Sequence, residues 1–434
     1  MAYLYRSNSG ASGTTATVSA WVKAVDTSTD SGIFQFKSGA DLVAFYVNPV
    51  IKFRSFISSS TANGALSPNR RMRDFSGWFH IVVTIDTTNA TSGDRLIYYV
   101  NGERVTGFTT ETYPSQNYSY APMVSGNFEL GKYSSYDRPI YLAHVHYCDG
   151  YAYNADSFGS TDSVTGEWKI NTNPNVQYGS NGVFLKFANS ASMVTDSSGN
   201  NNTMSLSGSC LQTQDCPSNV FCTFNPLFRQ VDTGTSKGNT RFETVSGSGW
   251  RSMCGTLGME KNTGKYYMEF KHLGGTNIGY GIADYTGGGV VEKINTGTST
   301  YAGNNANSYG YLSQGEFFYN GSYTASGWNS YTTNDIIGMA VDMENMKLYF
   351  HKNGTYENSG NPTAGTGGYT IADPVNAYLP VVSVNAGILC ANFGNGYFQE
   401  TAIASEGTNA SGIGKFEYDV PTGYTALSTK GLNE

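Results

Sequence analysis

The strongest pattern of apolar and polar positions in the chain lies in residues 335–354. Residues 336–341 are apolar at both alternating sets of positions, which predicts a strand buried on both faces. The polar run 342–346 predicts a chain reversal, and residues 347–352, aromatic in the middle, predict a second strand. Asn353 and Gly354 tolerate positive φ, so the pattern predicts a β-hairpin followed by a tight turn.

The same order of elements occurs far upstream, in residues 78–102. An apolar run ends at Asp86, a polar loop follows, and an aromatic strand over 95–100 leads into Asn101-Gly102. Each copy of the pattern lies in its own half of the chain, and both halves are rich in β-forming residues. We therefore predict two all-β units.

Short apolar or alternating runs, separated by turns rich in glycine and polar residues, fill both halves of the chain. This spacing is typical of a β-sandwich or barrel. The polar cluster 58–64 is interpreted as one of the turns. The further strands predicted in the first half are 15–24, 32–37, 42–47, 51–57, 128–132, 140–148 and 182–187, and those in the second half are 242–245, 265–272, 277–283, 309–312, 316–319, 378–384 and 390–393.

Composition agrees with this organisation and limits the classes of partner that the chain is expected to bind. A chain of 434 residues allows two or three domains. The chain contains 32 tyrosines and 23 phenylalanines, and these residue types favour strands. The charged fraction of 14% is low against the ~25% of ordinary domains. A net charge of −7 lacks the basic footprint of a nucleic-acid-binding protein, so we predict no nucleic-acid partner.

No apolar run in the sequence is long enough for a transmembrane helix, so we predict no membrane insertion. Residues 1–7 lack the apolar core of a secretory signal, so we expect the chain to fold in a cytoplasm. Residues 206–240 separate the two units. Within them, residues 215–227 are too aromatic for a free linker, and we expect this segment to pack across the seam between a first domain (1–205) and a second (241–434).

The first domain resembles the concanavalin A-like lectin/glucanase group, specifically the laminin-G-like jelly roll. The similarity lies in the runs 19–23 (Ser-Ala-Trp-Val-Lys), 78–86, 99–102 and 142–150. Residues 158–159 and 164–169 also look like the variant of this domain in tailed-phage virion proteins. The resemblance implies an antiparallel β-sandwich.

The second domain resembles the SPRY (B30.2) domain. The matching runs, in order, are 264–270 (Gly-Lys-Tyr-Tyr-Met-Glu-Phe), 277–283, 335–342, 347–354, 378–383 and 391–394. The expected fold class is therefore all-β, with two tandem antiparallel sandwiches. A laminin-G-like domain followed by SPRY resembles structural proteins of marine tailed phages. That resemblance implies localisation in a virion assembled in the host cytoplasm, contacts with other virion proteins, and a homo-oligomer such as a trimer on the particle.

Catalytic patterns are missing from the sequence. Glucanases of the lectin-like group use carboxylates two residues apart on one strand, but no Glu-x-Asp-x-Glu run occurs, and Glu103, Glu111, Glu129 and Glu167 are isolated. No supported nucleophile elbow is present. We therefore predict a non-enzymatic protein.

We predict no cofactor, but calcium stays open. Laminin-G-like domains often hold calcium at one rim through Asp and Asn oxygens. The same residue types also serve turns without an ion. Acidic residues that lie at strand ends or in loops are Asp26, Asp30, Asp41, Asp86, Asp94 and Asp196.

Aromatic residues in loops are the candidate binding residues, because their faces stack on sugar rings. Resemblance to SPRY domains points to the loops 284–307 and 320–334. The alternative is that these side chains only pad loops or make subunit contacts. The candidates are Tyr118, Tyr120, Tyr133 and Tyr136 in the first domain and Tyr285, Tyr301, Tyr323, Trp328 and Tyr331 in the second.

The resulting hypothesis is a virion surface protein, a tail, fibre or capsid appendage, that recognises host-surface polysaccharide or protein. The sequence opens directly in the first sandwich, without a helical anchor, so a head decoration is as open as a tail fibre. Two alternatives remain. One is a cement protein of the particle without host binding. The other is a polysaccharide depolymerase, and the absence of a carboxylate pair argues against it.

Overall fold

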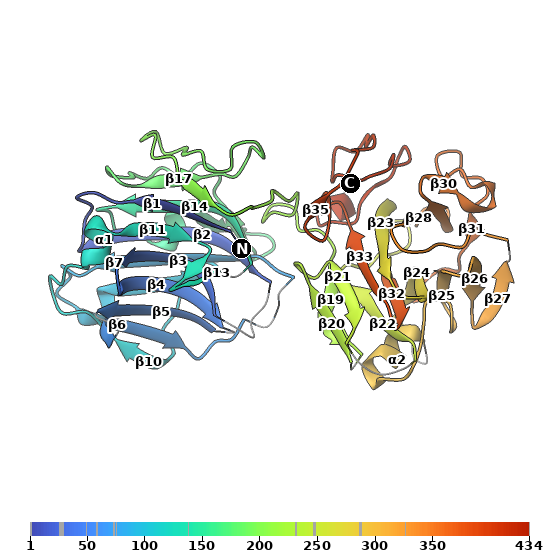
Figure 1. The fold of residues 1–434 in the computed structure, drawn as a ribbon, viewed down its shortest axis with the longest axis horizontal. Helices are drawn as coiled ribbons and strands as arrows, with labels where there is room; N and C mark the ends of the chain where they lie inside the picture. The colour runs from blue at the N-terminus through green and yellow to red at the C-terminus, as the bar shows by residue number, and fades with distance from the viewer. Residues whose placement is uncertain are drawn as a thin grey trace. The chain divides into compact units, whose positions relative to one another are not determined.

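The structure is a computed structural model that describes residues 2–25, 30–48, 50–57, 60–72, 74, 76–137, 139–230, 232–245, 249–285, 289–325 and 327–433. The chain forms two compact units, unit 1 (Met1–Gln212) and unit 2 (Thr213–Glu434). Each unit is a sandwich of two sheets whose strands pair antiparallel almost throughout, which confirms the predicted fold class (Figure 1).

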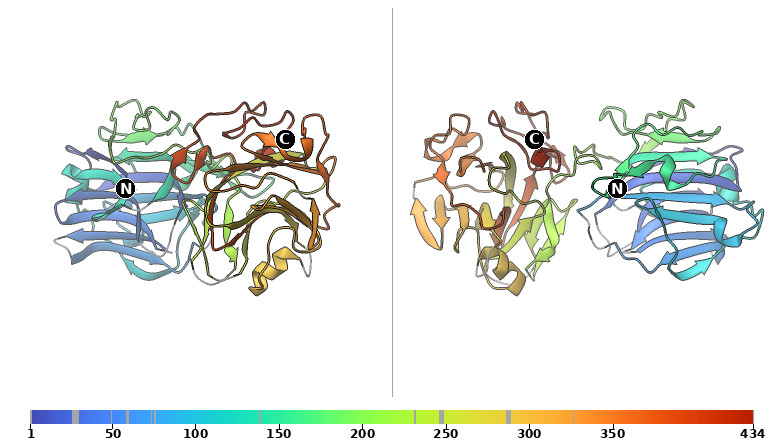
Figure 2. Two further views of the ribbon diagram at one scale, coloured as in Figure 1. Left: turned by 45° about the vertical axis from the view of Figure 1, so that its right-hand side comes forward. Right: turned by 180° about the vertical axis from the view of Figure 1, so that it is seen from behind.

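Unit 1 packs an eight-stranded sheet, of order β10-β6-β5-β4-β3-β11-β1-β18, against a six-stranded sheet, of order β17-β14-β2-β7-β8-β9. Figure 2 shows the same unit from behind. The strands of the first sheet are β1 (Tyr3–Ser7), β3 (Ser31–Ser38), β4 (Asp41–Asn48), β5 (Val50–Ile57), β6 (Ser60–Pro68), β10 (Phe108–Thr112), β11 (Asn127–Leu130) and β18 (Ser205–Ser207); those of the second are β2 (Thr15–Ala24), β7 (Phe79–Asp86), β8 (Leu96–Val100), β9 (Glu103–Arg104), β14 (Ile140–Asp149) and β17 (Val183–Leu185).

The core of unit 1 lies between these sheets and is built by inward-facing aromatic and branched residues such as Phe34, Phe45, Val83 and Tyr98. Smaller elements complete the unit: α1 (Ala121–Ser125), the hairpin of β12 (Lys132–Tyr133) and β13 (Tyr136–Asp137), the pair β15 (Gly159–Thr161) and β16 (Trp168–Ile170), and the 3-10 turns η1 (Ser92–Asp94) and η2 (Ala155–Ser157).

One turn prediction is wrong. The polar cluster 58–64 belongs mostly to strand β6, which pairs with β5 and β10; residues 58 and 59 lie outside the described residues. Ala65 and Leu66, two further residues of the strand, are buried. The strand is specified by its place between two partners rather than by its own composition.

Unit 2 packs a seven-stranded sheet, of order β19-β22-β32-β24-β25-β26-β27, against a nine-stranded sheet whose main path is β20-β21-β33-β23-β28-β29-β30. The first contains β19 (Phe224–Arg229), β22 (Arg251–Gly255), β24 (Asn277–Asp284), β25 (Ser308–Leu312), β26 (Glu316–Tyr319), β27 (Ser322–Ala325) and β32 (Tyr378–Asn385); the second contains β20 (Thr233–Ser236), β21 (Arg241–Thr244), β23 (Lys265–Gly274), β28 (Ile336–Asp342), β29 (Lys347–Lys352), β30 (Thr355–Tyr356), β31 (Tyr369–Thr370), β33 (Ile388–Asn392) and β36 (Thr425–Ala426). Outside these paths lie α2 (Val290–Thr296), β34 (Tyr397–Phe398), β35 (Thr401–Ala402), η3 (Glu357–Ser359) and η4 (Gly431–Asn433).

Both predicted hairpins are confirmed. β28 pairs with β29 from Ile337↔Lys352 to Asp342↔Lys347, and β7 pairs with β8 from Ile81↔Val100 to Ile85↔Leu96. The Asn-Gly pairs that follow have positive φ at both residues, as the two-residue turns of β8–β9 and β29–β30 require.

The Asn side chain plays the same part in both hairpins. Asn101 Oδ1 accepts the backbone N–H of His80 at 2.8 Å, and Asn353 Oδ1 accepts that of Ile336, also at 2.8 Å. Each Asn backbone N–H also donates to the carbonyl of the same partner at 2.8 Å. The Asn thus extends the ladder by one rung beyond the strand.

The aromatic segment 215–227 packs within unit 2. Phe221 bridges to Ser428, Cys222 N donates to Leu427 O at 2.9 Å, and Phe224 is buried in the core. It is therefore not a free linker.

Residues 403–426 lie over the outer face of the nine-stranded sheet, and we call them the C-terminal cover. Phe416 and Tyr424 pack there on Tyr267, on the side of β23 opposite Met268 in the core. The cover is anchored by the buried carboxylate of Glu269. Glu269 accepts the backbone N–H of Glu417 at 2.9 Å and that of Tyr418 at 2.8 Å.

Side chains complete the acceptor set of this carboxylate. Tyr267 donates its hydroxyl to Glu269 at 3.1 Å, and Asn392 donates its amide at 3.3 Å. His351 Nδ1 accepts the N–H of Gly354 at 3.0 Å, so its Nε2 carries the proton and donates to the Tyr267 hydroxyl at 2.6 Å. A relay of hydrogen bonds therefore runs from the Asn-Gly turn to the carboxylate under the cover.

Candidate recognition surface

Four aromatic side chains form a continuous, partly exposed series on unit 2, which we call the aromatic row: Trp250, Tyr301, Phe318 and Tyr323. The ring centroids are 4.9 Å apart between Trp250 and Tyr301, 5.6 Å between Tyr301 and Phe318, and 5.7 Å between Phe318 and Tyr323. Tyr323 is 49% exposed, and the other three are half-buried. The planes turn from ring to ring, so the row offers both faces and edges to a ligand.

The row is held in place by residues 298–304, which cross the outer face of the seven-stranded sheet; we call them the crossing segment. Its main chain and one serine hydroxyl are bonded to β22, β32 and their neighbours. A segment fixed in this way presents its side chain without losing conformational entropy on binding. The bonds are Trp250 N to Ser299 Oγ (3.1 Å), Ser252 Oγ to Thr300 O (2.7 Å), Ala302 N to Ser383 Oγ (2.9 Å) and Gly303 N to Ser308 Oγ (2.7 Å).

A glycine in the sheet makes room for the crossing segment. Gly310 pairs with Phe318 in the ladder, and a Cβ on Gly310 would lie 2.1 Å from the carbonyl oxygen of Ala302. Gly303 has φ +87° and brings the segment against the Cβ of Phe318. The close approach of backbone to backbone sets Tyr301 beside Phe318.

The four side chains of the row are themselves uncharged at neutral pH. Burial raises the pKa of Tyr301, and the nearby Glu316 carboxylate raises it further, so the phenol stays protonated at neutral pH. Neighbouring positions on the crossing segment and in the β26–β27 turn are amides and hydroxyls, including Asn304, Asn320 and Ser322. Aromatic faces beside neutral hydrogen-bonding groups suit sugar rings and peptide surfaces.

The predicted loop 284–307 contains a helix, α2. Helix α2 buries Val290, Val291 and Ile294 against the outer side of the sheet and ends at Gly297, which has φ +74°. Residues 286–288 lie outside the described residues. Of the two candidates in this stretch, Tyr301 joins the row, whereas Tyr285 is 60% exposed and has its nearest ring neighbour in Phe228, at 6.4 Å.

In the second predicted loop, 320–334, Tyr323 joins the row, whereas Tyr331 and Trp328 turn inward, which corrects the prediction for these two residues. Tyr331 is buried, and its hydroxyl donates to the carbonyls of Ile278 and Tyr311, both at 2.9 Å. Trp328 packs on the core residue Phe317, with ring centroids 4.9 Å apart. Both side chains hold the sandwich together rather than facing a ligand.

Two candidates of unit 1 are also buried, which is a further correction. The Tyr120 hydroxyl donates to the carbonyl of Asn63 at 2.5 Å, and the Tyr133 ring stacks on Tyr46 with centroids 4.0 Å apart. Tyr118 is half-buried and meets the Tyr120 ring edge-on at 5.0 Å. Only Tyr136, 57% exposed, stands clear of the core. The structure does not bring these residues together into one site.

Sequence reasoning missed Trp250 and Phe318. Phe317 and Phe318 are indistinguishable in the pattern, and only the pairing of β26 with β25 decides which ring enters the core. A signal was present in Gly310, the ladder partner of Phe318, because a glycine inside a strand often marks close approach of another backbone.

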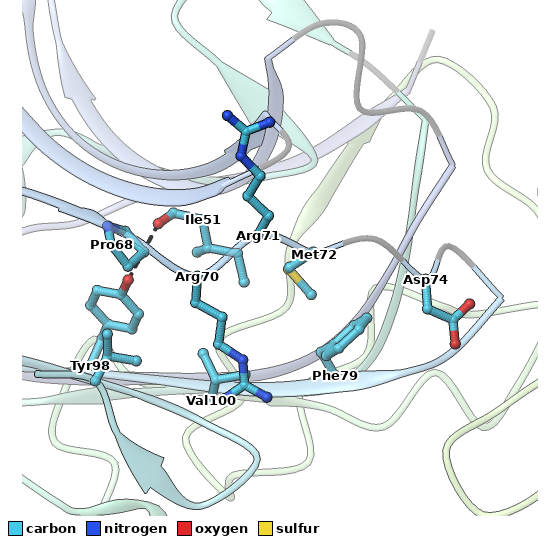
Figure 3. A pocket seen from close by; sticks show the side chains of 10 residues that line it. Ile51, Pro68, Arg70, Arg71, Met72, Asp74, Phe79, Tyr98 and Val100 are labelled. Carbon is cyan, nitrogen blue, oxygen red and sulfur yellow. Dashed lines mark hydrogen bonds between the residues drawn. The ribbon is translucent and has the colours of Figure 1, made fainter. Parts of the chain in front are cut away.

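A pocket of about 230 Å³ lies in unit 1 between the sheets, floored by apolar residues such as Ile51, Phe79 and Val100 (Figure 3). Arg70 and Arg71 stand at its rim, but their side chains extend in opposite directions (Figure 3). Arg70 also pairs with Glu103 at 3.3 Å. The positive charges do not converge, so the pocket does not form an anion site.

A Ser-His contact in unit 1 is not a nucleophile–base pair. His80 Nε2 lies 2.9 Å from Ser19 Oγ, and Trp168 Nε1 donates to His80 Nδ1 at 2.9 Å. Because Nδ1 is the acceptor, the neutral ring carries its proton on Nε2 and donates to Ser19. Burial lowers the pKa of His80 to about 3. The imidazole has no lone pair facing the hydroxyl and cannot deprotonate it.

The aspartates considered for calcium are bound to protein donors. Asp30 accepts the amide of Asn48 at 2.7 Å, and Asp94 pairs with Arg104 at 2.7 Å. Asp86 accepts from Thr88 and Asp196 from Ser198, each within its own turn, and Asp41 also has a partner. Asp26 lies outside the described residues. Across the part of the chain that the structure describes, no three His, Cys, Asp or Glu side chains gather as a metal site.

Comparison with known families agrees with this anatomy. Residues 2–137 match the model of the concanavalin A-like lectin/glucanases superfamily, in its laminin-G branch, and residues 265–396 match the SPRY domain. The chain therefore contains an N-terminal laminin-G-like domain and a C-terminal SPRY domain.

Solved structures similar to this chain include the SPRY domain of human HERC1 (15% identity, TM-score 0.30, covering 39% of this chain and 96% of that one). Another is a human SPRY domain (13%, 0.28, 38% and 94%), and a third is the heptameric SAP-like pentraxin from Limulus polyphemus (12%, 0.25, 34% and 69%). No curated protein matches the chain. Among the described residues, no helix is long and apolar enough to span a membrane.

Proposed function

We propose that this chain is a non-enzymatic recognition protein that binds host-surface polysaccharide or protein through the aromatic row. The observation that carries the proposal is the row itself, whose four rings stay in contact with one another and with solvent. Partly exposed, contiguous aromatics are the side chains that supply most binding free energy at recognition surfaces.

The crossing segment supports the proposal because it fixes the row before any ligand arrives. The uncharged side chains of the row favour uncharged sugar rings over a strongly charged partner. The low charged fraction of the chain, 14%, points the same way.

The place of action belongs to the same proposal. The order of a laminin-G-like domain and a SPRY domain resembles structural proteins of marine tailed phages. We therefore place the chain on the surface of a virion, as a homo-oligomer in contact with other virion proteins.

Binding is tested with the purified full chain on a glycan array and on surface polysaccharide and envelope-protein fractions of marine bacteria. We expect the double variant Tyr301→Ala/Tyr323→Ala to lose binding at least tenfold, because each exposed ring contributes roughly 1 kcal/mol or more to recognition. The matched control is Tyr285→Ala, an exposed tyrosine of the same unit outside the row, which should bind as the parent chain does.

Equal binding by the double variant and the parent would remove the row from the recognition site. No binding to any fraction, together with particles that fall apart without the chain, would favour a cement protein. Release of reducing sugar from the polysaccharide by the purified chain would contradict the non-enzymatic part. Labelled antibody on virions tests the location.

A further inference from the structure

We propose that unit 1 carries a contact for a second copy of this chain, in which the side chain of Val164 enters the apolar pocket of the neighbouring copy. The pocket is the one of about 230 Å³ that has Arg70 and Arg71 at its rim. This contact rests on the homo-oligomer named in the proposed function and supplies its interface, but it does not depend on ligand binding by the aromatic row.

Val164 is the most exposed large apolar side chain among the described residues, at 91%. It lies at the tip of the turn 162–167, which joins β15 to β16. The neighbouring residues 163 and 165–167 are exposed as well, so the valine projects from the unit without cover. Single exposed apolar residues are common on protein surfaces, but this one is held in a fixed position by its turn.

The turn that presents Val164 is rigid. One carboxylate oxygen of Asp162 accepts the backbone N–H groups of Val164 and Thr165, both at 2.9 Å. The other oxygen of Asp162 is bonded to Lys169 at 2.7 Å, and Gly166 N donates to the Asp162 carbonyl at 2.9 Å. A side chain presented by a fixed turn loses little conformational entropy on binding.

The pocket suits an apolar side chain better than it suits water. Its walls include the apolar residues Ile51, Met72, Val100 and Val105. The Tyr98 hydroxyl faces the carbonyl of Ile51 at 3.5 Å, inside the protein. A bound water needs two to four polar partners, which apolar walls do not offer. The volume of about 230 Å³ is large enough for the isopropyl group of a valine.

One positive charge at the rim of the pocket is left over for a partner. Arg70 is paired with Glu103 at 3.3 Å, and the Asp74 carboxylate accepts the backbone N–H of Ser76 at 2.8 Å within its own turn. Arg71 is exposed and has no hydrogen-bond or ion-pair partner in the part of the chain that the structure describes. Its side chain extends away from that of Arg70 (Figure 3).

The turn 162–167 carries the opposite charge. Asp162 is paired with Lys169, whereas the exposed carboxylate of Glu167 makes no hydrogen bond or ion pair to any described residue. A copy that inserts Val164 into the pocket brings Glu167 to the same rim, where it pairs with Arg71. The chain thus carries an apolar anchor, a pocket for it and one unpaired charge of each sign, which favours a second copy as the occupant.

The contact joins two different patches of unit 1, so it is head-to-tail. Each copy gives one Val164 and receives one. A contact of this kind closes into a ring, such as a trimer, or continues as an open chain of copies.

The test is analytical ultracentrifugation of the purified full chain over a range of concentrations. We expect the parent to associate and Val164→Asp to raise the dissociation constant at least tenfold, because a carboxylate replaces the apolar anchor. Val375→Asp changes an exposed valine of unit 2 in the same way and is the matched control, which should associate as the parent does. Both valines are exposed, so neither change should unfold its unit.

Charge reversal tests the ion pair. Arg71→Glu and Glu167→Arg should each raise the dissociation constant roughly two- to fivefold, as expected for an exposed pair. The chain that carries both changes should associate about as the parent does, because the pair is restored with its signs exchanged.

The outcomes separate this contact from the proposed function. A parent chain that stays monomeric would overturn both the contact and the homo-oligomer. Association of Val164→Asp at the strength of the parent would overturn the contact alone and leave the homo-oligomer standing. No recovery in the double variant Arg71→Glu/Glu167→Arg would also overturn the contact, since the two side chains would then not meet.

Discussion

The two Asn-Gly hairpins share one backbone design and differ in what covers them. In unit 1 the outer side of β7 carries His80, which is covered by the Trp168 indole, and the same indole packs on Gly102. In unit 2 the outer side of β29 carries His351, which meets the Tyr418 ring, and that ring packs on Gly354. Each glycine leaves room for the covering ring where a Cβ would clash.

The chemistry under the two covers is different. In unit 1 the imidazole relay ends on the neutral hydroxyl of Ser19, whereas in unit 2 it passes through Tyr267 to the buried carboxylate of Glu269. One sandwich holds its cover with ring packing and a hydroxyl, and the other holds a long chain segment with a buried carboxyl group. The comparison shows that the hairpin is scaffold, and that the covering segment decides how the unit responds to its surroundings.

The largest difference should follow from removing the end of each relay. Glu269→Ala leaves the N–H groups of Glu417 and Tyr418 without an acceptor under the cover. A buried unsatisfied donor costs about 1–3 kcal/mol, so the two together should cost unit 2 about 2–6 kcal/mol of unfolding free energy. Ser19→Ala removes one neutral bond and should cost unit 1 about 1 kcal/mol.

The measurement is hydrogen exchange by mass spectrometry on the full chain, read separately for peptides of β23 and β28 and of β2 and β7. Glu260→Ala, an exposed glutamate of unit 2, is the control and should change nothing. Equal losses from Glu269→Ala and Ser19→Ala would mean that the buried carboxyl group under the cover has no special role.

The second difference concerns pH. Burial raises the pKa of Glu269 from 4.5 to about 7, so the native state binds this proton more tightly, and unit 2 loses stability as pH rises through that range. Burial lowers the pKa of His80 and of His351 to about 3, so both units lose stability as pH falls below 6.5. Between pH 6.5 and 4.5 the Glu269 proton offsets the histidine loss in unit 2.

Glu269→Gln removes that offset. Acidification from pH 6.5 to 4.5 should then destabilise unit 2 more steeply than in the parent, by about 1.4 kcal/mol per pH unit at most, and leave unit 1 as it was. The free energies come from urea unfolding followed by hydrogen exchange at each pH, with Glu260→Gln as control. A parallel pH dependence in variant and parent would show that Glu269 does not titrate in this range.

The smallest effect tests what the hairpins share. Asn101→Ala and Asn353→Ala each remove the extra rung and place alanine at φ 49° and φ 48°. Each should cost its unit about 1–2 kcal/mol, from one lost bond and a strained φ. Asn353 also donates to Asp335 at 2.7 Å, so unit 2 should lose slightly more.

Glycine replacements separate the two causes, since Asn101→Gly and Asn353→Gly lose the side-chain bond but not the backbone freedom. Chemical denaturation with hydrogen exchange reports both pairs. A loss of stability in one unit without a matching loss in the other would show that Asn101 and Asn353 do not play the same part.

The hairpins could be predicted because their signals are local. Apolar runs with period two, a terminal Asp and an Asn-Gly pair act over a few residues, and both predicted turns have the expected positive φ. Strand β6 could not be predicted, because its polar residues form a strand only between β5 and β10. The C-terminal cover is a long-range packing event of the same kind.

The candidate surface was predictable only in part, because ring exposure depends on how loops fold back. Tyr301 and Tyr323 stand in the aromatic row, but Tyr331, from the same predicted loop as Tyr323, is in the core, and Trp328 packs against it. Phe318 was hidden beside Phe317 in one strand, where pairing rather than residue type decides which ring faces outward. Polar composition marks a loop, but not the direction of its aromatic side chains.

The way the crossing segment is attached has a consequence for how this molecule can change. Its bonds use its own main chain and Ser299, and the side chain at position 301 takes no part in them. The hydrogen bonds that hold the backbone of the segment therefore do not depend on which residue stands there. Position 301 can be randomised in a library of variants to select new ligand preferences, because the segment holds the backbone of this position in place.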